Sequence, residues 1–187
     1  MATVWLNMQK EATRWGTEHP SVVPYSAFKT KDSYIVCGAT NNRQFQSMVG
    51  LLGCPEVAED ERFATTDKRV ENRDVLKAIL DGCFVKRTTA EWLKVLDGSG
   101  MPYGPINNME DSFKHPQTAA REMIEVVDFE ALAGEQLKLV GIPVKFGDTK
   151  TSIRRRPPLL GEHTEEILRE AGVDVDRVEW LRENKVL

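Results

Sequence analysis

The sequence predicts an α/β protein of the α+β kind, in which a small domain is followed by a helical segment. Three observations favour this fold class. Several segments space their apolar residues as helices do, one short run at 33–39 is almost wholly apolar, and residues 122–141 alternate with period two around a turn. The 187 residues suffice for one hydrophobic core, with or without an appendage.

The first element that we expect is a helix over 1–15, where Val4 and Met8 have helical spacing. Nothing in the sequence caps its start, which is typical of the end of a longer helix. Gly and Pro residues then break the chain into a loop as far as Pro24, because the residue before each Pro is held near extended geometry. The strand at 33–39 follows this loop.

Four helices are predicted after the strand. An apolar set at i, i+3, i+4 and i+7 predicts a first helix that Gly53 can end in a left-handed conformation. A single long helix is expected over 67–86, which carries an apolar stripe. Thr88 and Glu91 have the spacing of a capping box and predict the start of the next helix. A short helix is expected at 109–114.

The last third of the chain changes pattern. The stretches EMIEVVDF and QLKLVG alternate apolar and polar residues around a turn that contains Gly134, which predicts a β-hairpin. Residues 151–160 have the composition of a linker. Two helices are expected to close the chain, at 164–171 and at 175–184.

Charge excludes some classes of partner. The 25 basic and 29 acidic residues give a net charge of −4, and the only basic cluster is at 154–156. Nucleic-acid binding requires Lys and Arg gathered over a face, so we expect no nucleic-acid partner. No apolar run is long enough for a transmembrane helix and the N-terminus lacks the pattern of a signal peptide, so we expect no membrane partner.

The cysteines number three, Cys37, Cys54 and Cys83, and each stands in an apolar run. Their odd number and wide spacing are not typical of a disulfide framework or of a zinc site. We therefore expect buried thiols in a reducing compartment.

The stretch RRRPPLLGEHTEEILREAG combines a basic run with a histidine at a helix start. His163 could be a general base, but Glu165 and Glu166 beside it are what the positive end of a helix favours, and we prefer this structural interpretation. The arginines at 154–156 could hold a phosphate or a carboxylate, although a solvated charge run is the commoner outcome.

Two Gly- and Pro-rich stretches are further candidates. GSGMPYGPINNM places Tyr103 and Gly104 in a loop that either makes a tight turn between domains or contacts a ligand. TRWGTEHPSVVPY gathers Arg14, Gly16 and His19 beside aromatic residues, which suits ligand contact and interdomain packing equally. No nucleophile motif, phosphate-binding loop or metal spacing is present, so these patterns predict no catalytic residue and no metal.

Four stretches belong together in this order: RWGTEHPSVVPYSAFKTKDSYIVCGATNNRQF, GMPYGPINNM, HPQTAAREM and RRPPLLGEHTEEIL. Together they resemble the class III CoA-transferase family, which includes formyl-CoA transferase and the carnitine CoA-transferases. The resemblance begins near Leu6, extends to the C-terminus and follows the family's order of motifs. It is strongest to the branch of succinyl-CoA:glutarate CoA-transferases.

Family members are about twice as long as this chain, and the resemblance covers their second half only. It implies the end of a large-domain helix with a crossing loop at 1–24, a small domain at 25–125 and a β-hairpin with a return linker at 126–160. Helices at 161–187 would then pack on a Rossmann-like large domain that this chain lacks. That domain carries the nucleophilic aspartate of the family, so the resemblance implies no catalytic residue here.

The implied reaction is nucleophilic catalysis by a carboxylate. CoA moves between an acyl-CoA, such as succinyl-CoA, and a carboxylic acid, such as glutarate, so that coenzyme A is a substrate and no cofactor is expected. A loop closes over the intermediates and excludes water. The family's loop is rich in glycine, whereas the matching region here has only Gly16. Substrate or CoA contacts are expected from Arg14, Gly16, His19, Lys29, Tyr103 and Gly104.

The resemblance further implies an interlocked homodimer at full length, in the mitochondrial matrix of a eukaryote or otherwise in the cytoplasm. A shorter chain would then expose apolar surface near Val4, Trp5, Val178 and Leu181. Two alternatives stay open, an acyl-CoA racemase or isomerase of the same fold and a non-catalytic interaction module.

Overall fold

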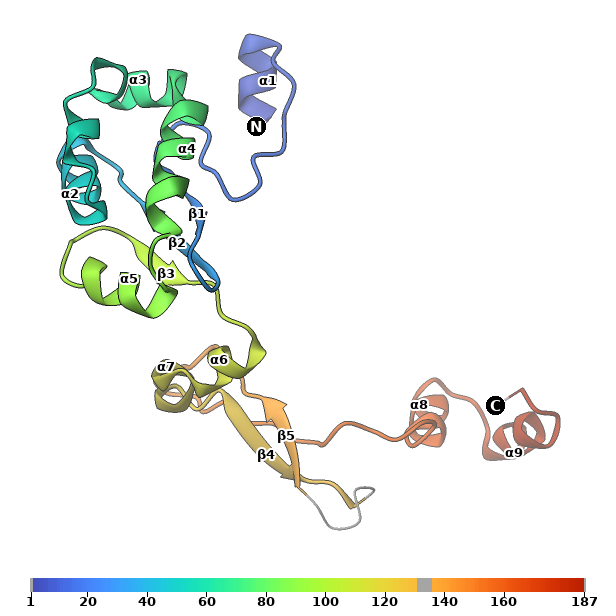
Figure 1. Cartoon of the computed structure of the whole chain (residues 1–187). Coiled ribbons are helices and arrows are strands. Elements are labelled where there is room, and N and C mark those ends of the chain that lie inside the picture. The colour runs from blue at the N-terminus through green and yellow to red at the C-terminus, as the bar shows by residue number, and fades with distance from the viewer. Residues whose placement is uncertain (1, 131–135, 187) are drawn as a thin grey trace. The chain divides into compact units, whose positions relative to one another are not determined.

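The computed structural model describes residues 2–130 and 136–186, in two compact units that meet between Asn107 and Asn108. Figure 1 labels the elements of both units. The N-terminal unit contains α1 (Ala2–Met8), β1 (Tyr25–Lys29), β2 (Tyr34–Gly38), α2 (Asn42–Leu52), η1 (Pro55–Ala58), η2 (Glu61–Phe63), α3 (Thr66–Glu71), α4 (Arg73–Phe84), α5 (Thr89–Leu96) and β3 (Tyr103–Pro105). The second unit contains α6 (Met109–Lys114), α7 (Pro116–Ala120), β4 (Ile124–Asp128), β5 (Gln136–Val140), α8 (Thr164–Glu170) and α9 (Val175–Glu183).

The sheet of the N-terminal unit is antiparallel with the strand order β1-β2-β3. Directly opposed residues point to the same face of a sheet. One face is the core face, on which Phe28 and Ile35 are opposed and 1% and 0% exposed. The second face is less buried and consists of Tyr25, Ala27, Lys29, Tyr34, Val36, Gly38 and Gly104.

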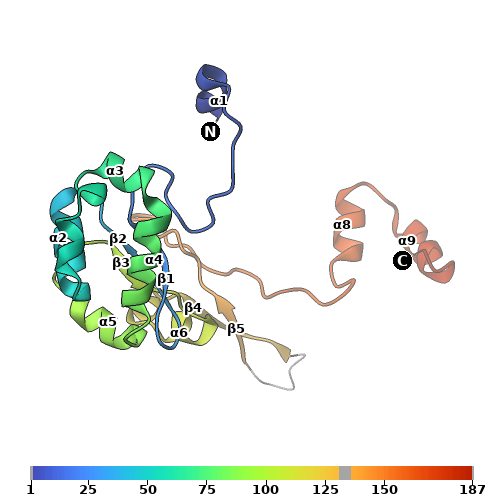
Figure 2. The same cartoon turned by 45° about the horizontal axis from the view of Figure 1, so that its top comes forward.

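Helix α4 packs along β1, as Figure 1 and Figure 2 show. Phe28 of β1 stacks on Phe84 of α4, with ring centroids 4.5 Å apart, and Phe84 meets Trp92 of α5 edge to face at 5.4 Å. The indole Nε1 of Trp92 donates to the carbonyl oxygen of Phe84 at 2.6 Å, which satisfies its only polar atom. This aromatic stack holds the two helices on the core face.

Several helix ends lie where short sequence patterns predicted them. Gly53 has φ 75° and ends α2 in the left-handed region. Thr88 and Glu91 form the predicted capping box at the start of α5. The three cysteines are buried and free, in agreement with the sequence.

Other predictions were wrong in extent. The helix expected over 67–86 is two helices, because Asn72 breaks it with φ −106° and ψ 28°. The Asn72 side chain donates to the carbonyl oxygens of Lys68 and Arg62, a local bond that competes with helix continuation. The first helix ends at Met8, where the sequence predicted 1–15. Strands β1 and β3 and helix α7 were not predicted at all.

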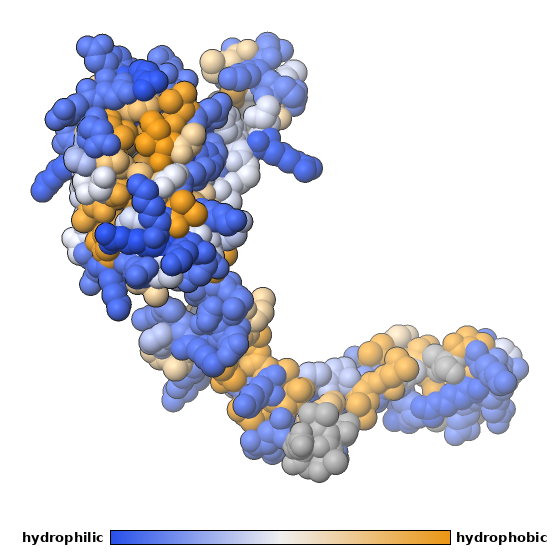
Figure 3. All heavy atoms as spheres, viewed as in Figure 1, coloured by the Kyte–Doolittle hydropathy of each residue, from blue (hydrophilic) through white to orange (hydrophobic). Residues whose placement is uncertain are grey.

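The second unit contains the predicted hairpin, β4 paired with β5, in which Ile124 is opposed to Val140. Its turn, with Gly134, lies outside the described residues. The hydropathy surface in Figure 3 is apolar over this hairpin, where Ile124 and Val140 are 42% and 65% exposed. Val178 of α9 is buried at 2% exposed, so the expectation that it lies on exposed surface was wrong, whereas Trp5 is 45% exposed as expected. None of the helices in the described residues is long and apolar enough to cross a membrane.

Candidate functional site

We call residues 14–24 the crossing loop, because they lead from the N-terminal segment into β1. A turn opens the loop, in which the amide of Glu18 donates to the carbonyl oxygen of Trp15 at 2.9 Å. Gly16 follows Trp15 in this turn with φ 60°, a left-handed conformation that costs glycine little. The amide of His19 then donates to the carbonyl oxygen of Tyr25 at 3.1 Å, which ties the loop to the start of β1.

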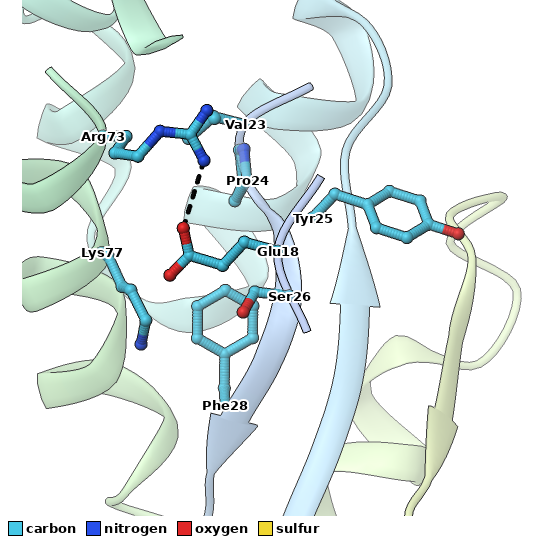
Figure 4. A pocket seen from close by; sticks show the side chains of 8 residues that line it. All are labelled: Glu18, Val23, Pro24, Tyr25, Ser26, Phe28, Arg73 and Lys77. Carbon is cyan, nitrogen blue, oxygen red and sulfur yellow. Dashed lines mark hydrogen bonds and ion pairs between the residues drawn. The ribbon is translucent and has the colours of Figure 1, made fainter. Parts of the chain in front are cut away.

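Arg73 of α4 holds the middle of the crossing loop. Its Nη1 lies 3.1 Å from Oε2 of Glu18 and donates to the carbonyl oxygen of His19 at 3.2 Å, while Nη2 donates to that of Pro20 at 2.7 Å. The guanidinium carbon lies 4.6 Å from the centre of the Trp15 ring. Figure 4 shows Glu18 and Arg73 turned toward each other. Their side chains are only 25% and 14% exposed, so solvent screens this ion pair less than a surface pair.

Arg69 of α3 holds the end of the crossing loop from inside the core. Its side chain is 0% exposed, and its Nε donates to the carbonyl oxygen of Val23 at 2.8 Å. Nη1 donates to the carbonyl oxygen of Phe63 at 3.0 Å, and the guanidinium lies 4.5 Å from the centre of the Phe45 ring. Burial lowers the pKa of Arg69, but an arginine remains charged at neutral pH. The neighbouring carbonyl dipoles therefore stabilise a buried cation.

His19 is exposed, and its Nδ1 accepts a hydrogen bond from the amide of Ser21 at 3.2 Å. A neutral imidazole that accepts at Nδ1 carries its proton on Nε2, so Nε2–H is the group that His19 can offer to a ligand. Its ring meets Tyr25 edge to face at 5.9 Å. The Tyr25 ring in turn covers Gly38, where an added Cβ would lie 2.3 Å from Cδ2 of Tyr25.

The other predicted residues are spread over the unit. Arg14 and Lys29 are exposed. Lys29 ends β1, roughly 13 Å along the strand from Tyr25 and therefore away from His19. Tyr103 points to the core face, opposite Cys37, and its hydroxyl lies 3.4 Å from Oδ1 of Asp97.

Gly104 lies on the second face of the sheet, opposite Val36. An added Cβ at Gly104 would meet nothing within 4 Å, so packing does not demand a glycine there.

Burial raises the pKa of Tyr103, which keeps its hydroxyl protonated near neutral pH. Arg14, Gly16 and His19 thus belong to the crossing loop, while Lys29, Tyr103 and Gly104 lie in strands β1 and β3.

Two hollows border the crossing loop, and their sizes distinguish them. The cavity of Figure 4 has a volume of about 20 Å³, which is room for one water molecule. A groove of about 380 Å³ is large enough for a small ligand. It is lined by Val4, Lys10, Glu11, Ala12, Thr13, Trp15, Pro20, Ser21, Val70 and Arg73.

The groove combines an apolar lining with cationic groups, because Trp15 and Val70 face it together with Lys10 and Arg73. Nε1 of Trp15 is buried and has no hydrogen-bond partner among the described residues. No sequence pattern indicated Arg73, since an arginine on a half-buried helix is most often a surface residue. No group of metal-ligating side chains occurs within 2–130 and 136–186.

The basic run at 154–156 has carboxylate partners. Arg156 pairs with both carboxylate oxygens of Glu162 at 2.8 and 2.7 Å. Glu166 lies 3.3 Å from Arg155 and 3.0 Å from Nδ1 of His163. These pairs favour the structural interpretation of the motif as the start of α8.

Comparisons with known proteins agree with this fold. The sequence matches CoA-transferase family III over residues 1–164. It is 48% identical over 183 residues to an acyl-CoA transferase of Fusarium pseudograminearum, across 98% of this chain and 40% of that protein. It is 45% identical over 170 residues to the Homo sapiens succinyl-CoA:glutarate CoA-transferase, across 91% of this chain and 38% of that protein.

This chain belongs to CoA-transferase family III. The crystal structure of a CaiB/BaiF family protein from Brucella suis superposes with a TM-score of 0.73 at 34% identity, over 90% of this chain and 43% of that chain. This likeness confirms the predicted α/β class with its small domain. This chain spans about 40% of the length of the two CoA-transferase relatives named above. The crossing loop and the sheet both lie within the matched residues.

Proposed function

We propose that this chain is the C-terminal portion of a CoA-transferase that moves CoA from an acyl-CoA, such as succinyl-CoA, to a carboxylic acid, such as glutarate. The observation that carries the proposal is the 45% identity over 91% of this chain to a succinyl-CoA:glutarate CoA-transferase. Relatives named for glutarate and mesaconate from Agrobacterium fabrum and Haloarcula marismortui are both 32% identical. A dicarboxylic acceptor is therefore the substrate class that the proposal favours.

The proposed chemistry uses an aspartate outside these residues as the nucleophile. Its carboxylate attacks the thioester carbon of the donor and expels CoA thiolate, which forms a mixed anhydride. The thiolate then attacks the aspartyl carbon, releases the donor acid and leaves an aspartyl-CoA thioester. The acceptor carboxylate attacks the carbonyl carbon of this thioester and expels CoA thiolate, which forms a second mixed anhydride. The thiolate then attacks the acceptor's carbonyl carbon, which gives the new acyl-CoA and releases the aspartate carboxylate.

The crossing loop supplies the groups for the end of the substrate that does not react. Arg14 and Nε2–H of His19 are exposed donors on a loop that Arg73 fixes. We assign them to the second carboxylate of a dicarboxylic acid, which charge-assisted hydrogen bonds recognise well. Gly16 allows the turn between them. Lys29 is assigned to a CoA phosphate.

We also propose that Tyr103 and Gly104, which belong to β3, line the path of the CoA or of the acyl chain. It also covers the division into a crossing segment at 1–24, a small domain at 25–125, a hairpin and return linker at 126–160 and packing helices at 161–187. The full-length enzyme would be a homodimer. In a eukaryote we place it in the mitochondrial matrix, as for the branch that it resembles.

The test compares this chain with a version extended upstream to full length, using succinyl-CoA and glutarate and mass spectrometry of glutaryl-CoA. We expect turnover from the extended protein only. Turnover by the 187-residue chain would place the nucleophile among these residues and contradict the mechanism. Absence of turnover in a folded extended protein would contradict the proposed substrates.

Arg14→Gln in the extended enzyme tests the acceptor site, with Arg121→Gln as a matched exposed control. Loss of a charge-assisted hydrogen bond should raise KM for glutarate by roughly 10- to 100-fold. Equal effects of the two variants would remove Arg14 from the site.

A further inference from the structure

Two of the three cysteines lie side by side in the core. The Sγ atoms of Cys54 and Cys83 are 3.5 Å apart, although the residues are 29 positions apart in the sequence. Both residues are 5% exposed, and neither is in a disulfide. Cys37 is as deeply buried in β2, at 0% exposed, and makes no sulfur contact of this kind in the described part of the chain. Proximity therefore distinguishes one pair and leaves the third thiol as an internal control.

The local backbone allows the two sulfur atoms to come closer. A disulfide needs an S–S distance of about 2.05 Å, so the present gap must shorten by roughly 1.5 Å. Cys54 follows Gly53, which ends α2, and precedes the short 3-10 helix η1. Cys83 lies in the last turn of α4, which ends at Phe84. Ends of elements open at lower free energy than their middles, so this region is where the fold can adjust.

We propose that Cys54 and Cys83 form a dithiol site that small disulfides, such as oxidised glutathione, convert to an intramolecular disulfide. One protein thiol loses its proton and its thiolate attacks a sulfur of the small disulfide, releasing one small thiol. The second protein thiolate attacks the protein sulfur of this mixed disulfide. The Cys54–Cys83 bond forms, the second small thiol leaves, and the small disulfide is reduced by the two electrons that the protein thiols lose.

The closed fold protects this pair. Burial raises the pKa of Cys54 to about 12, and the neighbouring Cys83 adds to the shift. Thiolate is the reactive species, so the closed pair exchanges slowly. Opening at Gly53 and Cys54 returns the thiol to water, where its pKa is ordinary. The reaction rate should therefore follow the population of the locally opened state.

The experiment incubates the native chain with oxidised glutathione at about pH 8, a condition under which an exposed thiol is partly ionised. The sample is then quenched in acid, alkylated, digested and analysed by mass spectrometry. We expect a peptide pair joined through Cys54 and Cys83, with the chain two hydrogens lighter and Cys37 alkylated. Cys37→Ala should give the same product. Cys83→Ala should stop at a mixed disulfide between Cys54 and glutathione.

The same treatment of urea-unfolded chain provides the reference for unselective pairing. There all three thiols are exposed, and pairs that include Cys37 should form as well. The proposal is overturned if the native chain keeps Cys54 and Cys83 free after prolonged incubation. It is also overturned if Cys37 joins native disulfides in comparable yield. Because the unmodified chain gives both results, the test does not depend on a variant that folds poorly.

Discussion

The Nε–H of Arg69 donates to the carbonyl oxygen of Val23 at 2.8 Å, in a core where the two residues are 0% and 6% exposed. Four residues later, Arg73 holds the carbonyl oxygens of His19 and Pro20. Two arginines from neighbouring helices thus fix successive parts of the loop that carries Arg14, Gly16 and His19, three of the six predicted site residues. Both bind backbone oxygens, so the loop's position depends on these arginines more than on the side chains it presents.

Arg69→Met should destabilise the fold strongly. The variant leaves the carbonyl oxygens of Val23 and Phe63 buried without these donors, and it removes the cation above Phe45. We expect a loss of about 3–5 kcal/mol in the free energy of unfolding. Urea denaturation followed by circular dichroism measures it.

Arg62→Met is the matched control, because Arg62 pairs with Asp60 at the surface, where its side chain is 54% exposed. Exposed pairs contribute at most about 1 kcal/mol. Similar midpoints for the two variants would show that the buried guanidinium has no special role.

Arg73→Gln should loosen the crossing loop while the rest of the fold stays intact. Loss of contacts worth about 2 kcal/mol should speed hydrogen exchange at the amides of Glu18 and His19 roughly 30-fold. Exchange at Trp92 should not change. Lys77→Gln removes a cation one turn further along α4, which pairs with Asp81, and should leave the loop amides as they are. Equal protection in both variants would refute the role of Arg73.

Gly38→Ala, a substitution in strand β2, should disturb the contact between Tyr25 and His19 at the candidate site. A methyl group at Gly38 would lie 2.3 Å from Tyr25, so the Tyr25 ring must move away from its contact with His19. Forced shifts of this kind cost about 1–3 kcal/mol. Gly104→Ala is the control, because its methyl group meets no atom within 4 Å. The two thermal midpoints should differ, and coincident midpoints would contradict the packing described here.

Acid should weaken the N-terminus of α5. The amide of Thr88 donates to Oε2 of Glu91 at 2.8 Å, and this bond is the main cause that lowers the pKa of Glu91 below its ordinary value of 4.5. A carboxyl group with a lowered folded pKa contributes stability above the unfolded pKa and loses it as pH falls through the folded one. Stability should therefore fall below about pH 4.5, and Glu91→Gln should make that decline shallower. Thermal midpoints between about pH 6 and pH 3 measure it, and parallel curves for both proteins would contradict the prediction.

Local patterns predicted much of the fold. The capping box at Thr88 and the left-handed Gly53 each depend on a few neighbouring residues, which the sequence displays directly. The break at Asn72 was missed because the side-chain bonds of Asn72 to the carbonyl oxygens of Lys68 and Arg62 leave no trace in the spacing of the apolar residues. Strand β1 was missed because YSAFK contains polar residues whose burial depends on partners far along the chain.

The candidate site was predicted only in part. The sequence located the crossing loop through its Gly, Pro and His residues, which act on the local backbone. No sequence pattern indicated that Arg73, which lies 53 residues after Pro20, would bind the loop, because tertiary packing alone creates that contact. Tyr103 was predicted as a candidate from its Gly/Pro surroundings, and only the register of β3 shows that it lies on the core face, half-buried opposite Cys37.

Because a buried cation holds the carbonyl oxygen of Val23, the C-terminal end of the crossing loop can move only if the core opens. Residues 9–15, before the turn at Gly16, belong to no helix or strand. Torsional adjustment must therefore occur upstream of His19. A proline at Ala12, which stiffens that stretch, should slow the entry and release of a ligand while leaving untouched every contact made from Glu18 to Val23.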